Sequence, residues 1–367
     1  MFILNKTKSK RIFYLDALRA LAIISVINFH IFNGALSRFV VYDYAVIPSF
    51  NWILTDVMLN CFRLGVITFL MLSGALSLGR KWEIKTFLGR RIPRIVWPYA
   101  LWTAFFIIIY MILSYFFNFP IIKSFEIHSL LDFIYKMALG QNHFGNHLWF
   151  FWMILGTYLI MPIFDKWIAE CSLREVEYFL FFWLITCLFT YTLKIEFPIA
   201  LTYFTGSIGF VVLGYYLRYT DRKLLNNVYF DILLILVVSI SAAVLAYLFS
   251  SPGHIFKFER DSIFMALEGA GVFLLFKNFG QLNLNMDFIT QPGRFFNKFT
   301  LLLAKYSYGI YLVHLPIIRI AMIILPLSII KFKGAVVSLW IIALCGSLAL
   351  LYVFSKIPPL RDKIGVK

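Results

Sequence analysis

Three side chains that can carry charge interrupt one apolar segment near the N-terminus. They are Asp16, Arg19 and His30, in the run RIFYLDALRALAIISVINFHI. On a helix, Arg19 and His30 are three turns and about 20° apart, so they project from one face, roughly 16 Å apart along the axis. Asp16 lies three residues before Arg19 and can pair with it. A guanidinium can bind an anion, and an imidazole can act as a general base near neutral pH. The same residues also fit a structural ion pair and an interfacial histidine.

A second cluster of cations lies in the segment KTFLGRRIPRIVWPYALW, residues 85–102. Arg91 and Arg94 are three residues apart and face one way if the segment is helical. Guanidinium groups hold phosphate oxygens bidentately, so the pair could bind a phosphorylated ligand. An ordinary basic cluster that contacts lipid headgroups is the alternative.

Other ionisable residues within apolar segments are weaker candidates for function. Glu268 lies in SIFMALEGAGVFLLF and needs a partner, and His314 lies in YSYGIYLVHLPII. A structural salt bridge is the simplest account of Arg63. His143 and His147 are four residues apart, a spacing that can bind metal on a helix, but Gly145 intervenes and a third ligand is not evident. We therefore expect no metal site.

The elements that position these residues must lie in a membrane. Of the 367 residues, 61% are hydrophobic and only 14% are charged, whereas a soluble domain is nearer half apolar and a quarter charged. One soluble core of this size could not bury so much apolar surface. The basic residues responsible for the net charge of +16 lie between the apolar stretches, as the positive-inside rule expects. The charge therefore does not indicate a nucleic-acid partner. The chain is predicted to be an all-α polytopic membrane protein.

Ten membrane-spanning helices are predicted from the apolar stretches. They cover residues 12–34, 52–78, 94–117, 147–168, 177–193, 199–217, 228–250, 260–279, 300–326 and 334–355. With both termini in the cytoplasm, the inner segments carry 23 Lys and Arg residues and the outer loops carry eight. This bias supports the predicted orientation.

The whole chain, 1–367, is predicted to form one integral-membrane domain. The longest gaps, 118–146 outside and 280–299 inside, are too short for a soluble catalytic domain. The basic residues 6–11 resemble the start of a signal peptide, but Asp16 and Arg19 interrupt the apolar region, so we expect an uncleaved first helix. The four cysteines form no CxxC pair, and we expect neither a disulfide nor a structural metal.

Taken together, these segments resemble the acyltransferase-3 family of integral-membrane acyltransferases. The family's arginine and histidine with ten residues between them are matched by Arg19 and His30. TFLMLSGALSLGR resembles the second-helix segment with Ser73 and Gly74, and FLGRRIPRIVWPY carries the Arg-x-x-Arg pattern. HLWFFWMILGTYLIMPIF and YSYGIYLVHLPI match later landmarks in the right order. The segment DALRA departs from a common Gly-containing version, a mild change in a helix.

The resemblance implies transfer of an acyl group, usually acetyl from acetyl-CoA, to a hydroxyl of a surface polysaccharide or lipid-linked glycan. The chain is similar to stand-alone members such as surface-polysaccharide and enterobacterial-antigen O-acetyltransferases, which implies a multi-pass protein of the bacterial inner membrane in contact with lipid. Arg91 and Arg94 would hold the CoA phosphates, and Arg19 would help to position the donor. His30 would act as the general base or carry the acyl group covalently; both routes fit the residues.

Four further residues are given supporting roles. Asp16 would fix Arg19, and His314 would be a second polar group in the cavity, with Ser73 and Glu268 as further candidates. Two other classes of function are also considered, and the first of them would likewise need about ten helices with buried charges. A transporter or flippase for a glycan or lipid-linked intermediate would move a solute without consuming a thioester. A non-catalytic component of a polysaccharide assembly complex would tolerate loss of every buried charge.

Overall fold

The structure is a computed structural model that describes residues 12–40, 48–119, 121–122, 124–195, 201–204, 206–281, 291–325 and 331–366. Over these residues it is all-α, as predicted, and its only β pairing is an isolated bridge between Ser251 and His254. The basic N-terminal segment and part of the predicted 280–299 gap lie outside the described residues. In chain order the helices are α1 (Phe13–His30), α2 (Ser37–Val40), α3 (Phe50–Asn60), α4 (Gly65–Ser77), α5 (Ile84–Phe117), α6 (Ile127–Ala138), α7 (Trp149–Glu170), α8 (Leu173–Thr186), α9 (Ile208–Tyr219), α10 (Val228–Phe249), α11 (Ile263–Gln281), α12 (Gln291–Ile324) and α13 (Phe332–Ser355).

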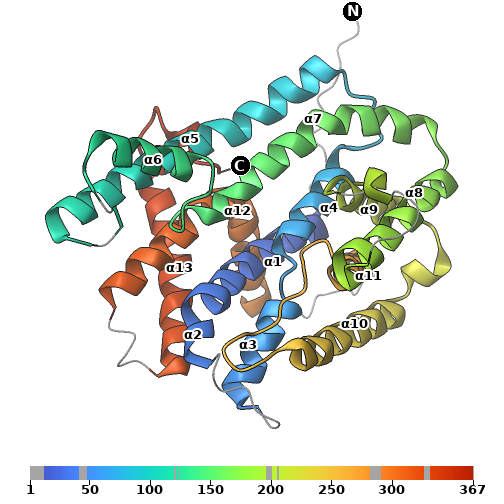
Figure 1. Ribbon diagram of the computed structural model, residues 1–367. Helices are drawn as coiled ribbons and strands as arrows, with labels where there is room; N and C mark the ends of the chain where they lie inside the picture. Colours follow the sequence, from blue (N-terminus) through green and yellow to red (C-terminus); the bar gives the residue numbers. More distant parts are fainter. Residues whose placement is uncertain are drawn as a thin grey trace, which may run out of the picture.

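Helix α1 lies inside the bundle and packs against α4, α11 and α12 (Figure 1). Its apolar residues Leu18, Ala22, Ile23 and Ile27 are fully buried. A helix whose sides are covered by protein can carry charged residues without exposing them to lipid. The location of α1 therefore explains how its three ionisable residues are tolerated.

Nine helical segments in the described part of the chain are long and apolar enough to cross a membrane. They coincide with nine of the ten predicted spans. The tenth, 199–217, is wrong as a single long helix: it contains a 3-10 turn (Leu201–Phe204) and the 12-residue α9, which rises only about 18 Å against a hydrocarbon core of about 30 Å. This segment still crosses the bundle, because Lys194 before it pairs with Glu259 at one end and Arg218 in its last turn bonds the Ala75 carbonyl at the other.

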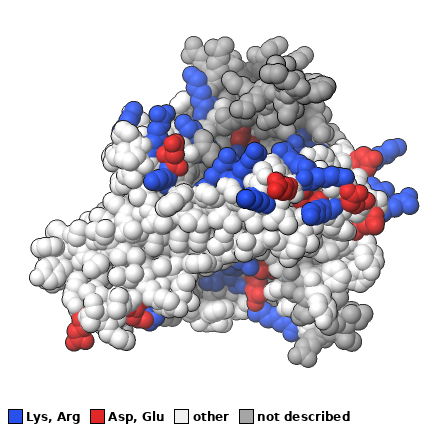
Figure 2. Space-filling view, turned by 90° about the horizontal axis from the view of Figure 1, so that it is seen from above, with Lys and Arg blue, Asp and Glu red and all other residues white. Residues whose placement is uncertain are grey.

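Loops from distant parts of the chain gather at one end of the bundle, which we call the basic end. There the Asp165 carboxylate accepts hydrogen bonds from the backbone N–H groups of Arg80 and Trp82, at 2.9 and 2.6 Å. The segment after α13 reaches the same end, where the Ile364 carbonyl accepts a bond from the Trp102 indole. Figure 2 shows Lys and Arg side chains concentrated along one part of the surface, a broad belt almost without charge beside it, and a smaller charged group beyond the belt.

Two predicted helix boundaries are corrected. The predicted span 52–78 is two helices, because the chain breaks at residues 61–64 between α3 and α4. The break seats Gly65 against α1, where a Cβ atom would lie 2.6 Å from the Ala22 carbonyl oxygen. Helix α5 begins at Ile84, ten residues before the predicted start, because its first turns are helical but too charged to be recognised as membrane-spanning. Helix α6 lies in the outer segment 118–146, where a helix was not predicted.

Helices α4 and α9 approach backbone to backbone at two glycines. A Cβ on Gly214 would lie 2.0 Å from the Met71 carbonyl oxygen, and one on Gly74 would lie 1.8 Å from that of Val211. Such contacts hold transmembrane helices together where small residues permit close packing. The short helix α9 therefore depends on these glycines for its location.

We predict that Gly214→Ala lowers the apparent melting temperature of the detergent-purified protein, because the added methyl group forces α9 away from α4, at a cost of about 1–3 kcal/mol. Gly156→Ala is the matched control, since a Cβ there meets no atom within 4 Å. That change should leave the melting temperature unchanged or raise it slightly, because alanine favours helix by up to about 1 kcal/mol. Equal melting temperatures of the two variants would contradict the close packing.

Candidate active site

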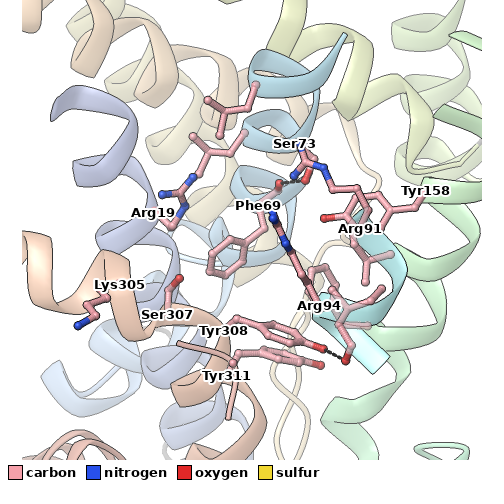
Figure 3. Close-up of a pocket in the computed structure, with 16 residues that line it drawn as sticks. Arg19, Phe69, Ser73, Arg91, Arg94, Tyr158, Lys305, Ser307, Tyr308 and Tyr311 are labelled. Carbon is pink, nitrogen blue, oxygen red and sulfur yellow. Dashed lines mark hydrogen bonds between the residues drawn. The ribbon is translucent and has the colours of Figure 1, made fainter. Parts of the chain in front are cut away.

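Arg19, Arg91 and Arg94 converge on one cavity at the basic end of the bundle (Figure 3). The cavity encloses about 860 Å³, part of it open to solvent. Helices α1, α4, α5, α7 and α12 all contribute to its walls. Of the predicted site residues, Ser73 also lines this inner cavity. Residues more than 70 positions apart in the sequence thus meet at one site.

Hydrogen bonds hold two of the three arginines. The Arg19 guanidinium donates to the buried Asp16 carboxylate at 2.9 Å, the ion pair that the spacing predicted. Arg91 donates to the Ser77 hydroxyl at 2.6 Å and stacks on the Phe87 ring. These contacts orient planar forks of N–H donors, which suit phosphate or carboxylate oxygens.

Helix α5 carries three arginines, Arg90, Arg91 and Arg94, which do not all face the cavity. Arg91 and Arg94 line the inner cavity, as the i, i+3 relation predicts. Arg90 is exposed and lies over the Trp82 ring, and it does not line the cavity. One arginine of the cluster therefore contacts the surface and two face the site.

Several polar residues of the inner cavity were not predicted from the sequence. Lys305, Ser307, Tyr158 and Tyr308 line it, and the Tyr308 hydroxyl donates to the Ile95 carbonyl at 2.8 Å. The sequence does contain a pattern that could have indicated them. Residues 308, 311 and 314 follow one another at intervals of three, so they share a face of α12. The face bears two tyrosines and a histidine, which is unusual for a membrane-spanning helix.

A second cavity lies behind the first and contains His30. This outer cavity encloses about 540 Å³ and is lined by His30, Ser25, Arg63, His147 and Arg260 among others. It lies towards the loop between α10 and α11, at the end of the bundle opposite the basic end: Arg260 of this loop lines the cavity, and Arg63 donates to the Phe258 carbonyl of the loop at 2.5 Å. Arg19 and His30, on the one helix α1, therefore belong to two different cavities.

The two cavities share a wall made of Phe150 and Tyr311, which line both. Their rings meet edge to face with centroids 5.0 Å apart, and both are buried. The Tyr311 hydroxyl donates to the His147 carbonyl, which fixes the ring. Two aromatic side chains thus form the boundary between the cavity of the arginine cluster and the cavity of His30.

Three histidine rings cluster at the shared wall. The His30 ring centroid lies 5.2 Å from that of His314 and 6.4 Å from that of His147. Carbonyls can only accept, so the bond from His147 Nε2 to Leu312 and the bonds from His314 Nδ1 to Ile310 and Tyr311 place one proton on each of those nitrogens. The other nitrogens, His147 Nδ1 and His314 Nε2, are buried acceptors without a partner in the described part of the chain.

His30 differs from its two neighbours. Among the described residues its ring makes no hydrogen bond with protein, and it lines the outer cavity. It is also the last residue of α1 before a π-helical segment, Ile31–Leu36. Such segments are frequent at functional sites because they change the direction of side chains. The ring nitrogens of His30 are therefore available to a ligand in the outer cavity.

Other predicted residues lie elsewhere. Glu268 is buried beside Ser239, whose hydroxyl donates to it at 2.7 Å, and it lines neither of the two cavities. The expected salt bridge of Arg63 is wrong: in the described part of the chain Arg63 bonds a carbonyl and stacks on Phe29, with no carboxylate partner. His143 is exposed while His147 is buried. No group of three or more His, Cys, Asp or Glu side chains among the described residues could hold a metal ion.

All four cysteines are in the described part of the chain and are free. Cys61 and Cys187 are buried in the bundle, and Cys345 is exposed on α13.

A comparison with known protein families matches residues 12–356 to the acyltransferase-3 family, described as an acyltransferase domain. The match covers nearly the whole chain. The chain belongs to the acyltransferase-3 family. This acyltransferase-3 protein is therefore a membrane acyltransferase, which disfavours the transporter and the non-catalytic component considered above. No curated protein and no solved structure matches the chain.

The two-cavity arrangement predicts opposite accessibility for two positions on α4. In a variant with Cys171 and Cys345 replaced by serine, Ser73→Cys should react with a membrane-impermeant maleimide from one side of the membrane only. Val66→Cys should react only from the other side, because Ser73 lines the inner cavity and Val66 the outer one.

The buried Ala75→Cys serves as the negative control and should react from neither side. Labelling would be followed by a gel shift in sealed vesicles of each orientation. Modification of the Ser73→Cys and Val66→Cys variants from the same side would contradict two cavities with opposite mouths.

Proposed function

We propose that this acyltransferase-3 protein moves an acetyl group from cytosolic acetyl-CoA to a hydroxyl of a cell-surface or lipid-linked glycan across the bacterial inner membrane. One observation carries the proposal. A single buried helix, α1, places Arg19 in a cavity at the basic end and His30 in a cavity at the opposite end, and the two cavities share a wall. The donor would enter from one side and the acceptor from the other.

The inner cavity suits the phosphate groups of CoA. It lies at the end of the bundle with the greater number of cationic residues, which the positive-inside rule assigns to the cytoplasm, where CoA is found. Arg91 and Arg94 would hold the phosphates, and Arg19, fixed by Asp16, would direct the donor towards α1. A guanidinium–phosphate bond is charge-assisted and often bidentate, so three such groups can bind a ligand with several phosphates strongly.

The pantetheine arm would reach His30 between Phe150 and Tyr311. Because these rings are only 5.0 Å apart between centroids, they must move to admit the thioester. A narrow aromatic passage favours a small acyl group over a long chain. This supports acetyl as the group transferred.

His30 would act as the general base. It accepts the proton of the acceptor hydroxyl while the hydroxyl oxygen attacks the thioester carbonyl, forming a C–O bond. Collapse of the tetrahedral intermediate breaks the C–S bond, and the thiolate of CoA takes up the proton from the His30 imidazolium. The products are the O-acetyl ester and free CoA, so atoms and charge balance. The rings of His314 and His147 pack beside the base, with centroids 5.2 and 6.4 Å from that of His30.

We predict that His30→Ala abolishes acetyl transfer while the protein stays folded, because a general base contributes about 10²–10⁴-fold to the rate. Membranes with each variant would be incubated with acetyl-labelled acetyl-CoA and extracted host glycans, and alkali-labile ester label would be counted. His128→Ala, at an exposed position of α6, is the matched control and should retain wild-type transfer. Wild-type turnover by purified His30→Ala protein would refute the assignment.

Donor binding gives a separate prediction. Arg91→Gln and Arg94→Gln should each weaken CoA binding by about tenfold to a hundredfold, because each removes charge-assisted hydrogen bonds of about 1.5–3 kcal/mol. Arg90→Gln should leave the affinity unchanged, since Arg90 contacts Trp82 outside the cavity. Isothermal titration calorimetry with purified protein measures the CoA affinity of each variant. If all three variants bound CoA with wild-type affinity, the arginine cluster would instead be assigned to contacts with lipid headgroups.

A further inference from the structure

The outer cavity contains a cation with unused hydrogen-bonding capacity. A guanidinium has five N–H donors, and Arg63 uses one nitrogen to bond the Phe258 carbonyl while its face covers the Phe29 ring. Among the described residues it has no carboxylate partner, although it lines a cavity within the membrane-spanning part of the chain. The carboxylates of Asp261 and Glu259 act on Arg63 electrostatically, but each is already paired with another cation, Arg260 or Lys194. The charge of Arg63 is therefore only partly compensated, and an anionic ligand would complete the compensation.

Two other cations, Arg260 and Lys257, lie close to Arg63. Arg260 lines the same cavity and stacks on Trp149, with its charge shared with Asp261 at 2.6 Å. Lys257 lies nearby and donates to the Asn33 side chain. Burial, and then the charge of Arg63, lower the pKa of the Lys257 ammonium from its ordinary value. Of the described residues that line the cavity, none is acidic.

Two buried polar atoms in the same cavity lack partners. Ser25 and His147 line it and are at most 2% exposed, yet in the described part of the chain Ser25 Oγ and His147 Nδ1 make no hydrogen bond. Buried polar groups are normally satisfied, so an exception calls for a ligand or water that bonds them. A hydroxyl-rich ligand can donate to both atoms.

We propose that the acceptor of this enzyme is an anionic sugar, whose carboxylate or phosphate binds Arg63 and Arg260 while its hydroxyls bond Ser25 and His147 beside His30. The inference rests on the proposed function, because it identifies the class of acceptor for the same site. The cationic pair fixes the sugar by its charged group, and the neighbouring hydroxyl then faces the His30 ring.

The test is a ligand-observed NMR titration of the purified full-length protein in nanodiscs, without CoA. The probes are three sugars, glucuronate, glucose 1-phosphate and neutral glucose, together with inorganic phosphate. Wild-type protein should bind at least one of the anionic probes about ten times more tightly than glucose. Glucuronate and glucose 1-phosphate separate a charge on the sugar itself from one at a phosphate linkage, and preference for either supports the proposal.

Variants assign the preference to the outer cavity. Arg63→Gln and, independently, Arg260→Gln should lower the affinity for the preferred anionic probe about tenfold and leave that for glucose unchanged. Arg90→Gln, which removes an arginine that stacks on a tryptophan at the other end of the molecule, should change neither. The use of two variants keeps the test valid if one of them does not fold.

The outcomes separate this proposal from the proposed function. Equal affinity for the three sugars, or inorganic phosphate bound as tightly as the sugar phosphate, would overturn the anionic acceptor even if acetyl transfer to neutral glycans is observed. Selective binding that depends on Arg63, without any acetyl transfer, would uphold the sugar site and refute the transfer reaction.

Discussion

The cost of charge inside a bilayer is the constraint on which this structure depends. Arg19 and His30 lie on one membrane-spanning helix, and neither could face lipid without a large penalty. The fold meets this constraint by surrounding α1 with α4, α11 and α12 and by opening a cavity at each charged position. Close packing of α4 on α9, at Gly74 and Gly214, completes the enclosure.

The same constraint explains why the two cavities lie back to back. One helix carries both ionisable groups, so its axis sets their separation, and the space between them must be closed to water and lipid. Phe150 and Tyr311 close it with apolar ring faces, while the Tyr311 hydroxyl is satisfied by the His147 carbonyl. This wall separates the donor site, which is rich in guanidinium groups, from the histidine that faces the opposite cavity. A thioester arm could pass through it if the two rings moved.

Much of this arrangement follows from local sequence patterns. The apolar stretches locate the spans, the i, i+3 relation aligns Arg91 with Arg94, and the same relation pairs Asp16 with Arg19. Contacts between distant segments could not be obtained in this way. Arg63 bonds a carbonyl 195 residues away, so its partner is invisible to spacing, and the salt bridge expected for it was wrong. His147 was considered only as a metal ligand, because the sequence does not show that it packs beside His30 and His314.

In the proposed reaction an acyl group crosses the membrane inside this protein, from the cavity of Arg19 to that of His30. Proteoliposomes of one fixed orientation would receive acetyl-CoA on a single face, with glycan acceptor on both faces, and the O-acetyl ester would be measured on each. Transfer is expected to require acetyl-CoA on the face that bears Arg91 and Arg94, with the ester formed on the opposite face. Ester formed on the face that received acetyl-CoA, or transfer from acetyl-CoA supplied at the His30 face, would refute transfer through the protein.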